Sequence, residues 1–438
     1  MLLVASTSRS ARADGYKIQL QGVKALGLGY SGRAIAEDAA AVWFNPSGMT
    51  QLTSPFTVTF GGAWIPFDLN YVDRGSFSVL GQALTGAASR NGGKTTLIPV
   101  PHFYGVIKLN DSWRVGLGFN APYGLSDDYG SEWAGRYHAT ESTLEVVNLT
   151  TTLAYKVNER LSLGGGIDVQ HSNATLSNRI DFGSLAVATG VPLVPQGHDG
   201  GIVLNASDWA FGFNLSTTLQ ATGRLRMAAT YRSAIVHTLR GTAEFEVPAS
   251  AAFFRAAGAF TTSGATATLP MPRELSGSAA LDLSTDKKWV LVGDYTWTDW
   301  SQFKLLQVSF DNPAQPAISQ RADYRDSNHG GVGLIFRATG SLTIRGGGLY
   351  ERTPVPDATR TPRLPEEDNL AVTVGGTYRV NPTWDLDFSL SHLIPHDAEI
   401  RLADPVIGTL NGTVGWKTTA IAVGLSHRFD KPWFTKRH

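Results

Sequence analysis

Three serine–histidine pairs are the residues of this chain whose types and spacing could support nucleophilic catalysis. They are His171-Ser172, Ser391-His392 and Ser426-His427, and in a barrel-shaped lipase or protease such residues would act at the outer rim. Each pair lies in a stretch that reads as a strand, and adjacent residues of a strand point to opposite faces of the sheet. The two members of a pair therefore cannot act together as nucleophile and base, and we expect ordinary strand residues.

Other catalytic or metal-binding patterns are missing from the sequence. The ten histidines form no H-E-x-x-H motif, there is no G-x-S-x-G elbow, and the absence of cysteine rules out disulfides and thiolate metal sites. Asp127, Asp128 and Glu132 form an acidic cluster, which we interpret as a solvated loop rather than a cation site. The sequence thus predicts neither an enzyme nor a metal or cofactor site.

Composition narrows the class of protein further. The formal net charge is zero, so nothing indicates a nucleic-acid partner. Charged residues make up 17% of the chain and aromatic residues 10%, and glycine occurs 47 times. This balance suits a β-barrel that faces lipid outside and water inside. No run of about eighteen apolar residues occurs, which excludes a helical membrane protein.

Apolar and polar residues alternate along most of the chain after Pro55, which predicts strands with one apolar face. In the stretch 209–215, for example, tryptophan, phenylalanine and leucine alternate with alanine, glycine and asparagine. Fourteen such strands are long enough to span a membrane at a tilt. They are predicted at 55–66, 100–109, 113–123, 143–157, 161–175, 208–220, 224–238, 273–284, 288–300, 328–338, 341–352, 368–380, 383–397 and 416–429.

Short and long connections alternate strictly between these strands. The long ones are 67–99, 124–142, 176–207, 239–272, 302–327, 353–367 and 398–415. This alternation is typical of an outer-membrane barrel with tight periplasmic turns and long external loops, and a soluble β-sandwich or propeller would not produce it. Trp113, Trp289 and Trp384 each follow a short turn, where an aromatic girdle would lie at the inner interface.

Two segments precede the first strand. Residues 1–13 end in Ala11-Arg12-Ala13, an A-x-A cleavage site before Asp14, and are predicted to be the remnant of a signal peptide. Residues 14–54, which we call the hatch, are rich in glycine and alanine and suit a plug that fills a narrow space. A short helix is expected at 34–43, ended by Asn45-Pro46. The barrel is assigned to 55–429, and 430–438 to a periplasmic tail.

The hatch also carries a family resemblance. Gly27-Leu-Gly-Tyr-Ser-Gly32, Ala36-Glu-Asp-Ala39 and Trp43-Phe-Asn-Pro-Ser-Gly-Met49 occur in order, and the segment resembles the N-terminal hatch of FadL-type outer-membrane transporters. That family (OMPP1/FadL/TodX) carries long-chain fatty acids and includes transporters of aromatic hydrocarbons. The resemblance implies a plugged fourteen-stranded barrel, with Gly27, Gly29, Gly32, Asn45 and Pro46 in the hatch.

The third predicted strand ends with a second matching motif. In Asn120-Ala121-Pro122-Tyr123-Gly124, proline removes a ladder donor and glycine permits a sharp bend. The strand could simply end there. The resemblance implies instead an inward kink that leaves a lateral gap in the barrel wall, through which ligand passes into the bilayer.

Two of the long connections, 176–207 and 239–272, are unexpectedly apolar for segments exposed to water. They could pack against each other as a cap over the barrel, or form the external groove that the resemblance implies for the first binding of ligand. The groove candidates are Leu185, Val187, Val191, Leu193, Phe253, Phe254 and Phe260.

Three arginines on predicted lumen-facing positions, Arg226, Arg345 and Arg379, could hold a ligand carboxylate. The alternative is structural pairing with acidic residues of neighbouring strands, for which Asp168, Asp294 and Asp387 are the candidates.

Together these features predict a monomeric outer-membrane barrel for passive uptake of hydrophobic molecules, with long-chain fatty acids as the ligand. Aromatic or alkane hydrocarbons are the alternative ligands, and a general porin is an alternative function. The expected partners are the ligand, outer-membrane lipid and, during biogenesis, the barrel-assembly machinery.

Overall fold

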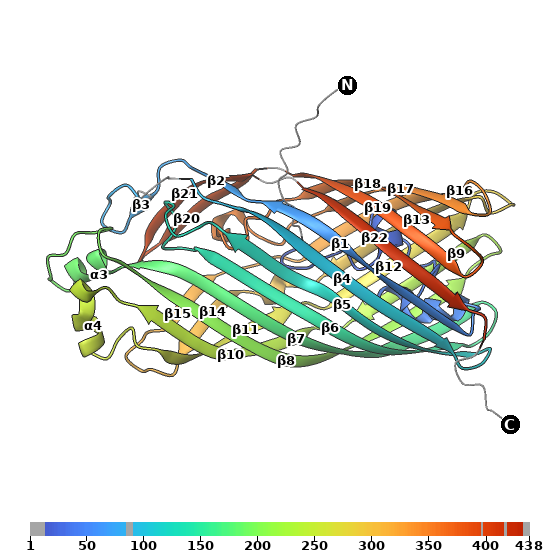
Figure 1. Cartoon of the computed structure of the whole chain (residues 1–438), viewed down its shortest axis with the longest axis horizontal. Coiled ribbons are helices and arrows are strands. Elements are labelled where there is room, and N and C mark those ends of the chain that lie inside the picture. The colour runs from blue at the N-terminus through green and yellow to red at the C-terminus, as the bar shows by residue number, and fades with distance from the viewer. Residues whose placement is uncertain (1–13, 85–90, 396, 416–417, 432–438) are drawn as a thin grey trace, which may run out of the picture.

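A computed structural model describes residues 14–84, 91–395, 397–415 and 418–431. The predicted signal-peptide remnant and most of the predicted tail lie outside these residues. Within them the chain folds into an antiparallel sheet that closes on itself as a barrel (Figure 1). Closure occurs where β1 (Phe56–Asp68) pairs with both β4 (Thr95–Lys108) and the last strand, β22 (Thr418–Phe429). No helix in this part of the chain is long and apolar enough to cross a membrane.

The barrel has the fourteen strands that the alternation predicts. Ten of them are continuous. Besides β1, β4 and β22, these are β5 (Trp113–Asp128), β6 (Glu141–Lys156), β7 (Leu161–Asp181), β8 (Asp199–Gln220), β17 (Leu342–Glu351), β18 (Asn369–Arg379) and β19 (Trp384–Pro395). Four are interrupted and therefore carry two labels each. These are β9 (Leu225–Arg232) with β10 (Ile235–Glu246), β11 (Ser263–Met271) with β12 (Glu274–Asp282), β13 (Trp289–Thr298) with β14 (Leu305–Phe310), and β15 (Ile318–Arg321) with β16 (Ser327–Arg337).

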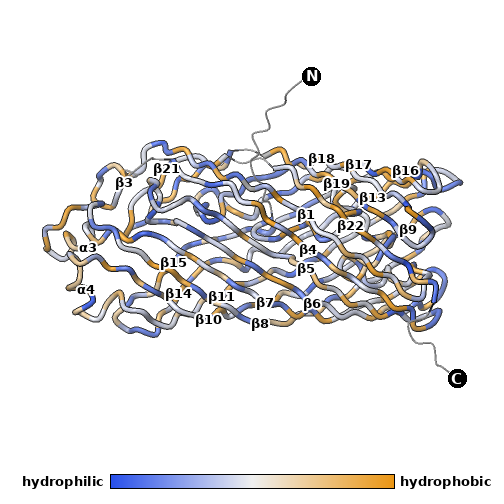
Figure 2. The backbone as a smooth tube through the Cα atoms, viewed as in Figure 1, coloured by the Kyte–Doolittle hydropathy of each residue, from blue (hydrophilic) through white to orange (hydrophobic). Residues whose placement is uncertain are grey.

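Hydrophobic and hydrophilic residues alternate along many of the strands (Figure 2). On β8, Trp209, Phe211 and Phe213 are exposed on the outside, whereas Asn214 and Ser216 are buried inside. This is the arrangement that a lipid-facing barrel requires, because the outer surface contacts hydrocarbon while the interior holds polar groups. The polar second face expected from the sequence is thus the lumen side.

The predicted strand ends are accurate at the short-turn end and wrong at the long-loop end. β7 continues to Asp181 and β8 begins at Asp199, so the predicted 176–207 loop shrinks to a short connection with one helix, α3 (Phe182–Ala188). Alternation weakens there because a strand that rises above the lipid has no need of an apolar outer face. For the same reason Asp127 and Asp128 belong to β5 rather than to a loop.

Other predicted loops also contain regular structure. The segment 398–415 forms β20 (Ala398–Asp404) and β21 (Gly408–Gly415), which build a separate small sheet with β2 (Asn70–Asp73) and β3 (Phe77–Ser78). The 239–272 connection holds the short helices η2 (Ala249–Ala251) and α4 (Ala252–Ala256), and η4 (Asp357–Thr359) lies in the 353–367 loop. α3, α4 and β3 all lie at the long-loop end (Figure 1).

The helix expected at 34–43 is wrong over most of its length. Only α2 (Ala41–Phe44) forms there, followed by η1 (Pro46–Gln51), and a further short helix, α1 (Val23–Leu26), forms in the glycine-rich part. The reason is that amides which a helix would use internally bond to the barrel wall instead. Ala34 N donates to Ser278 Oγ (3.0 Å), and Ala39 N donates to Thr59 Oγ1 (3.1 Å).

Candidate functional site

The hatch lies inside the barrel and contacts the wall on several sides. α1 packs against β18, β19 and β22, while η1 packs against β5, β6, β7 and β8. Because these elements are only four to six residues long, helix propensity cannot hold them in place. The fold of the hatch is therefore set by its contacts with the wall.

Glycines on both surfaces allow the hatch and wall backbones to approach closely. Gly29 has a φ of +63°, and a Cβ placed on it would lie 2.3 Å from the Gly348 carbonyl oxygen. A Cβ on Gly27 would lie 2.8 Å from Ser389 Oγ. Gly32, with a φ of +112°, turns the chain so that its amide donates to Asp294 Oδ1 (3.0 Å). These positions admit no larger residue without movement of the chain.

The Asn45-Pro46 turn is anchored to the wall rather than free. Asn45 Nδ2 donates to Arg33 O (2.8 Å) and to Thr218 Oγ1 (2.9 Å), and Ser47 N donates to Ser216 Oγ (2.8 Å). Pro46 starts η1, where its missing N–H costs no helical hydrogen bond. This turn fixes the last part of the hatch against β8.

Buried ion pairs join the hatch to four strands of the wall. Lys17 lies 2.9 Å from Glu274 on β12, and Arg33 lies 2.9 Å from Asp294 on β13. The remaining two pairs are Glu37 with Arg345 on β17 (2.6 Å) and Lys24 with Asp387 on β19 (3.5 Å). Losing one partner of such a pair leaves a buried charge uncompensated, which is strongly destabilising.

These pairs keep the hatch residues charged. Burial alone would raise the pKa of Glu37, but Arg345 and Lys24 lower it to about 2. Burial alone would lower the pKa of Lys24, but Asp38 and Asp387 raise it above its ordinary value. Both groups are therefore ionised at neutral pH.

The three arginines proposed for carboxylate binding all have partners within the protein. Arg345 bonds to Glu37 as described, and Arg226 Nη1 donates to Gln51 Oε1 of the hatch (2.9 Å). Arg379 Nε lies 3.3 Å from Asp385 Oδ1. The three aspartates considered as their partners pair elsewhere, Asp294 and Asp387 with the hatch and Asp168 with Arg232 (2.6 Å).

Arg232 is a further hatch contact that the sequence did not indicate. Its guanidinium lies 3.5 Å from the centre of the Trp43 ring and Nη2 donates to Trp43 O (3.0 Å). Arg232 thereby links Asp168 on β7 to α2 of the hatch.

The predicted kink in the third strand coincides with a break in the ladder of β5. Pairing with β6 shifts register between Asn120 and Tyr123, so that Ala121 and Pro122 together face a single residue of β6. Asn120 is buried and accepts a hydrogen bond from Asn148 Nδ2 (3.1 Å). Pairing with β4 on the other side ends at Asn120, opposite His102.

Beyond this point the hatch takes the place of β4 as the neighbour of β5. Ile18 N donates to Pro122 O (2.8 Å), Gly124 N donates to Tyr16 O (2.8 Å), and Lys17 pairs with Tyr123. The corresponding part of β4, residues 95–101, pairs with β1 and has no ladder to β5 among the described residues. It contains Pro99 and Pro101, and proline is tolerated at such sheet edges because it has no N–H donor.

A large apolar cavity occupies the long-loop half of the barrel. It encloses about 980 Å³ of empty space, part of which is open to solvent. Its walls come from β5, β6, β7, β8, β10, β11, β14 and β15, and Tyr16 of the hatch lines it as well. Much of this wall was predicted as loop, so sequence alternation did not reveal it. Among the lining side chains are Leu125, Leu144, Leu239, Leu269, Phe303 and Tyr324.

A second cavity, with about 660 Å³ of empty space that is partly open to solvent, lies beside the break between β4 and β5. Its lining includes Ile65 on β1, Ile98 on the open part of β4, and Gly124 on β5. Lys17 and Ile18 of the hatch also line it, whereas the preceding residue, Tyr16, lines the first cavity. The segment 16–18 thus lies between the two cavities.

An aromatic cluster covers the long-loop end. Phe260 lies 4.9 Å from Phe182 and 5.6 Å from both Phe254 and Phe245, measured between ring centres. Phe253 stacks on Phe254 at 4.4 Å and remains exposed. Of the other groove candidates, Leu185, Val191 and Leu193 are half-buried and Val187 is exposed. The two apolar connections therefore pack together and still present apolar side chains to the outside.

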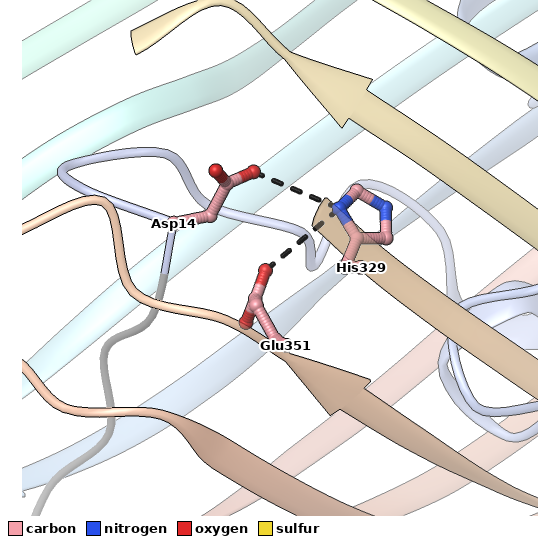
Figure 3. Close-up of side chains that lie close together, drawn as sticks. All are labelled: Asp14, His329 and Glu351. Atoms are coloured by element: carbon pink, nitrogen blue, oxygen red, sulfur yellow. Dashed lines mark ion pairs between the residues drawn. The ribbon is translucent and has the colours of Figure 1, made fainter. Parts of the chain in front are cut away.

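The described residues include one group that could hold a metal ion by donor type (Figure 3). His329 Nδ1 lies 3.7 Å from Asp14 Oδ2 and 4.0 Å from Glu351 Oε1. The amide nitrogen of Gln19 lies 3.1 to 3.4 Å from each of these three atoms. The point where an ion would sit is therefore filled by a side chain of the hatch.

The serine–histidine pairs lie as the strand geometry predicts. Ser391 is buried on the lumen side and bonds to Tyr30 OH (2.8 Å), whereas His392 is exposed on the other face. They cannot form a catalytic pair.

Comparison with known proteins gives this geometry a family context. A family model described as "Outer membrane protein transport protein (OMPP1/FadL/TodX)" matches residues 4–430. The chain belongs to this family. A "Long-chain fatty acid transport protein" of Salmonella typhi is 28% identical over 412 residues, which cover 91% of each chain.

Two solved structures share the fold of this FadL/TodX family member. A Pseudomonas aeruginosa FadL homologue superposes with a TM-score of 0.88 at 21% identity, covering 95% of this chain and all of the other. The Ralstonia pickettii toluene transporter TbuX gives a TM-score of 0.70 at 19% identity, covering 94% and 99%. The protein is thus an outer-membrane transporter of hydrophobic compounds and not an enzyme.

Proposed function

We propose that this FadL/TodX family member carries long-chain fatty acids passively across the outer membrane, as a monomer. The observation that carries the mechanism is the position of the hatch segment 16–18 between two cavities, one in the long-loop half of the barrel and one beside the break in the wall. Ligand would bind first at the exposed aromatic cluster, enter the apolar cavity, pass residues 16–18 when they leave β5, and exit between β4 and β5 into the bilayer.

The moving part of the hatch in this scheme is its beginning rather than the Asn45-Pro46 turn. Residues 16–18 are held to β5 by two backbone hydrogen bonds, and their displacement must also break the Tyr16 OH–Pro270 O hydrogen bond (2.6 Å) and the Lys17–Glu274 ion pair. Asn45 and Pro46 line neither of the two cavities, so movement of that turn would not join them.

Binding energies explain why two cavities are needed, with residues 16–18 as a gate between them. Burying about fourteen methylene groups at about 0.8 kcal/mol each gives about 11 kcal/mol, which approaches nanomolar affinity. Release from a single site of that strength would be slow. Displacement of residues 16–18 would join the cavities and weaken the first site, so no energy input is required.

Arg363 is the residue best placed to receive a fatty-acid carboxylate. Its Nη1 donates to Ser142 Oγ (2.9 Å) and its Nη2 donates to Asn178 Oδ1 (3.2 Å), both neutral acceptors. Its two other hydrogen bonds also go to neutral acceptors, Glu141 O (3.1 Å) and Ser177 O (3.2 Å), and Asp127 is the acidic residue whose charge acts on it. Burial lowers the pKa of Arg363 to about 10, so it stays charged, and the adjacent Thr361 and Leu364 line the first cavity.

Aromatic or alkane hydrocarbons are the second candidate ligands. The first cavity is lined almost entirely by apolar atoms, a surface that discriminates poorly among apolar molecules. A hydrocarbon would have no use for Arg363. Replacing Arg363 by glutamine should therefore weaken binding of a fatty acid about tenfold or more and leave toluene or alkane binding unchanged.

The control for this substitution is Arg401→Gln, because Arg401 is exposed and pairs with Glu399 on the small sheet. Equal fatty-acid affinity in the Arg363→Gln and Arg401→Gln proteins would contradict the carboxylate role and favour hydrocarbons. Mass spectrometry of molecules that co-purify with the native barrel would identify the ligand class directly.

A disulfide lock tests the gate. Lys17 and Tyr123 face each other across an antiparallel bridge, a geometry that places paired Cα atoms within disulfide reach, and the chain has no native cysteine. Oxidised Lys17→Cys/Tyr123→Cys protein should take up ligand at least tenfold more slowly, and a reductant should restore the rate. The two single-cysteine proteins are the controls, and uptake unaffected by oxidation would contradict the gate.

A further inference from the structure

The barrel wall contains a second break, between β11 and β14, which are neighbours in the long-loop half of the barrel (Figure 1). These strands pair at 265–267 with 308–310, and the next ladder toward the short turns joins β12 to β13 at 274–282 with 290–298. Between the two ladders, residues 268–272 face residues 300–307. No backbone hydrogen bond joins these two segments in the described part of the chain. The longer segment turns inward through η3 (Trp300–Gln302).

The end of β11 at this break is built like the edge of β4 at the first break. Pro270 and Pro272 lie two residues apart, as Pro99 and Pro101 do, and proline is tolerated where no neighbouring strand needs an N–H donor. The carbonyl oxygen of Pro270 accepts a hydrogen bond from Tyr16 OH (2.6 Å). A hatch side chain thus contacts β11 at this break, as the hatch backbone contacts β5 at the first one.

Apolar side chains close the break from the inside. Leu269 and Phe303 are buried, Leu306 is half-buried, and all three line the first cavity. The Tyr16 ring lies 4.7 Å from the Trp300 ring and 6.2 Å from the Phe303 ring, measured between centres. Side-chain packing and the Tyr16 hydrogen bond therefore hold the wall together where the β-ladder is interrupted.

The outer side of the break lies at the edge of the apolar band of the barrel. Val236 on β10, Tyr295 on β13 and Leu305 on β14 are exposed around it, and such side chains contact lipid in an outer-membrane barrel. Thr268 and Gln307, farther toward the long-loop end, are exposed and polar. The break therefore separates the outer leaflet from the first cavity by one layer of side chains.

We infer that this break is a second lateral opening, through which uncharged apolar molecules exchange directly between the outer leaflet and the first cavity. Such molecules pass neither the external loops nor the β4–β5 break. Leu269, Phe303 and Leu306 border the route, and burying an ionised carboxylate among apolar groups is costly, so the route suits hydrocarbons better than ionised fatty acids. Withdrawal of Tyr16 from Pro270 opens it. This inference rests on the proposed role of the first cavity as a ligand site.

Single-cysteine labelling tests the opening, because the chain has no native cysteine. Protein carrying Leu306→Cys is reconstituted into phosphatidylcholine vesicles that contain a phospholipid with a maleimide at the end of one acyl chain. We expect labelling at least tenfold faster than in Leu176→Cys protein, after correction for reactivity with a water-soluble maleimide. Leu176 is also half-buried and lines the first cavity, but it lies on β7, where it pairs with Ser142 and Leu204. Leu305→Cys, on the exposed side, calibrates reaction at the lipid surface.

A second substitution tests the role of Tyr16. Tyr16→Phe removes the hydrogen bond to Pro270 and should accelerate labelling of Leu306→Cys at least threefold. Tyr324→Phe is the matched control, because Tyr324 lines the same cavity and packs on Phe303 at 4.9 Å between ring centres; it should leave the rate unchanged. Retention of heat-modifiable migration on gels identifies variants that have folded.

Equal labelling of Leu306→Cys and Leu176→Cys would mean that the reagent enters between β4 and β5, and would overturn the second opening. Absence of labelling at Leu306→Cys would overturn it as well, and so would equal effects of Tyr16→Phe and Tyr324→Phe. Fatty-acid uptake by the same proteins reports on the proposed function separately, so either idea can fail without the other.

Discussion

Single residues decide whether the hatch can pack against the barrel wall, and Gly29 is the clearest case. A methyl group there would meet the Gly348 carbonyl and would also force a side chain into a left-handed backbone conformation. The sequence shows the glycines but not their partners, because nothing in the order of residues specifies which wall glycine faces which hatch glycine. For the same reason the arginines could be placed on lumen faces while their actual partners could not be predicted.

Gly29→Ala should weaken seating of the hatch by about 1–3 kcal/mol, the usual range for strained backbone. Hydrogen exchange in detergent should then show faster exchange of amides 23–34, with the barrel strands unchanged. Gly340→Ala, in a short turn where an added Cβ meets nothing within 4 Å, is the control. Identical exchange in the two proteins would show that the close approach at Gly29 is unimportant.

Glu37 makes seating of the hatch dependent on pH. With the hatch in place, the pKa of Glu37 is about 2 against a usual 4.5. Its contribution to the stability of hatch binding is therefore fully present above pH 4.5 and is lost as the pH falls through about 2. The loss amounts to at most roughly 3 kcal/mol. Exchange of hatch amides should accelerate across this range, and Glu37→Gln protein should lack that acid-dependent phase. Acid-dependent acceleration of equal size in the Glu37→Gln protein would mean that other carboxylates cause it.

At the scale of elements, the alternation of residues predicted every strand but not the strands' external ends. Lipid imposes an apolar outer face only within the bilayer, so β7 and β8 lose their signal where they rise above it. The cavity walls lie largely in that region, which is why Leu239, Leu269 and Phe303 were missed. The break in β5 was visible because proline and glycine act locally; its pairing with residues 16–18 was not.

The aromatic cluster at the long-loop end is expected to take part in the first capture of ligand. Phe253 is the exposed member, and its ring lies on Phe254, so Phe253→Glu removes apolar contact area without opening the cluster. Initial ligand capture should weaken by about 1 kcal/mol, or about fivefold, as measured with a fluorescent fatty acid on whole cells. Val406→Glu changes a more exposed apolar residue near the small sheet and should have no effect; equal losses in both would point to a general charge effect.

For the whole molecule, the sheet closes into a barrel within one chain, and the hatch lies inside it. Deleting residues 22–46 removes α1, α2 and the ion pairs of Lys24, Arg33 and Glu37. Single-channel conductance in planar bilayers should rise severalfold if the barrel still shows heat-modifiable migration on gels. A folded deletion protein with unchanged conductance would mean that the hatch does not block small solutes.

The seam between the first and last strands carries a consequence for biogenesis. At its middle Gly61 faces Gly424, and Val23 of the hatch lies so near that a Cβ on Gly424 would meet it at 2.9 Å. β22 therefore closes the cylinder directly over α1 of the hatch. A hatch displaced toward this joint would obstruct pairing of the two strands, so we expect correct placement of α1 and closure of the barrel to depend on each other.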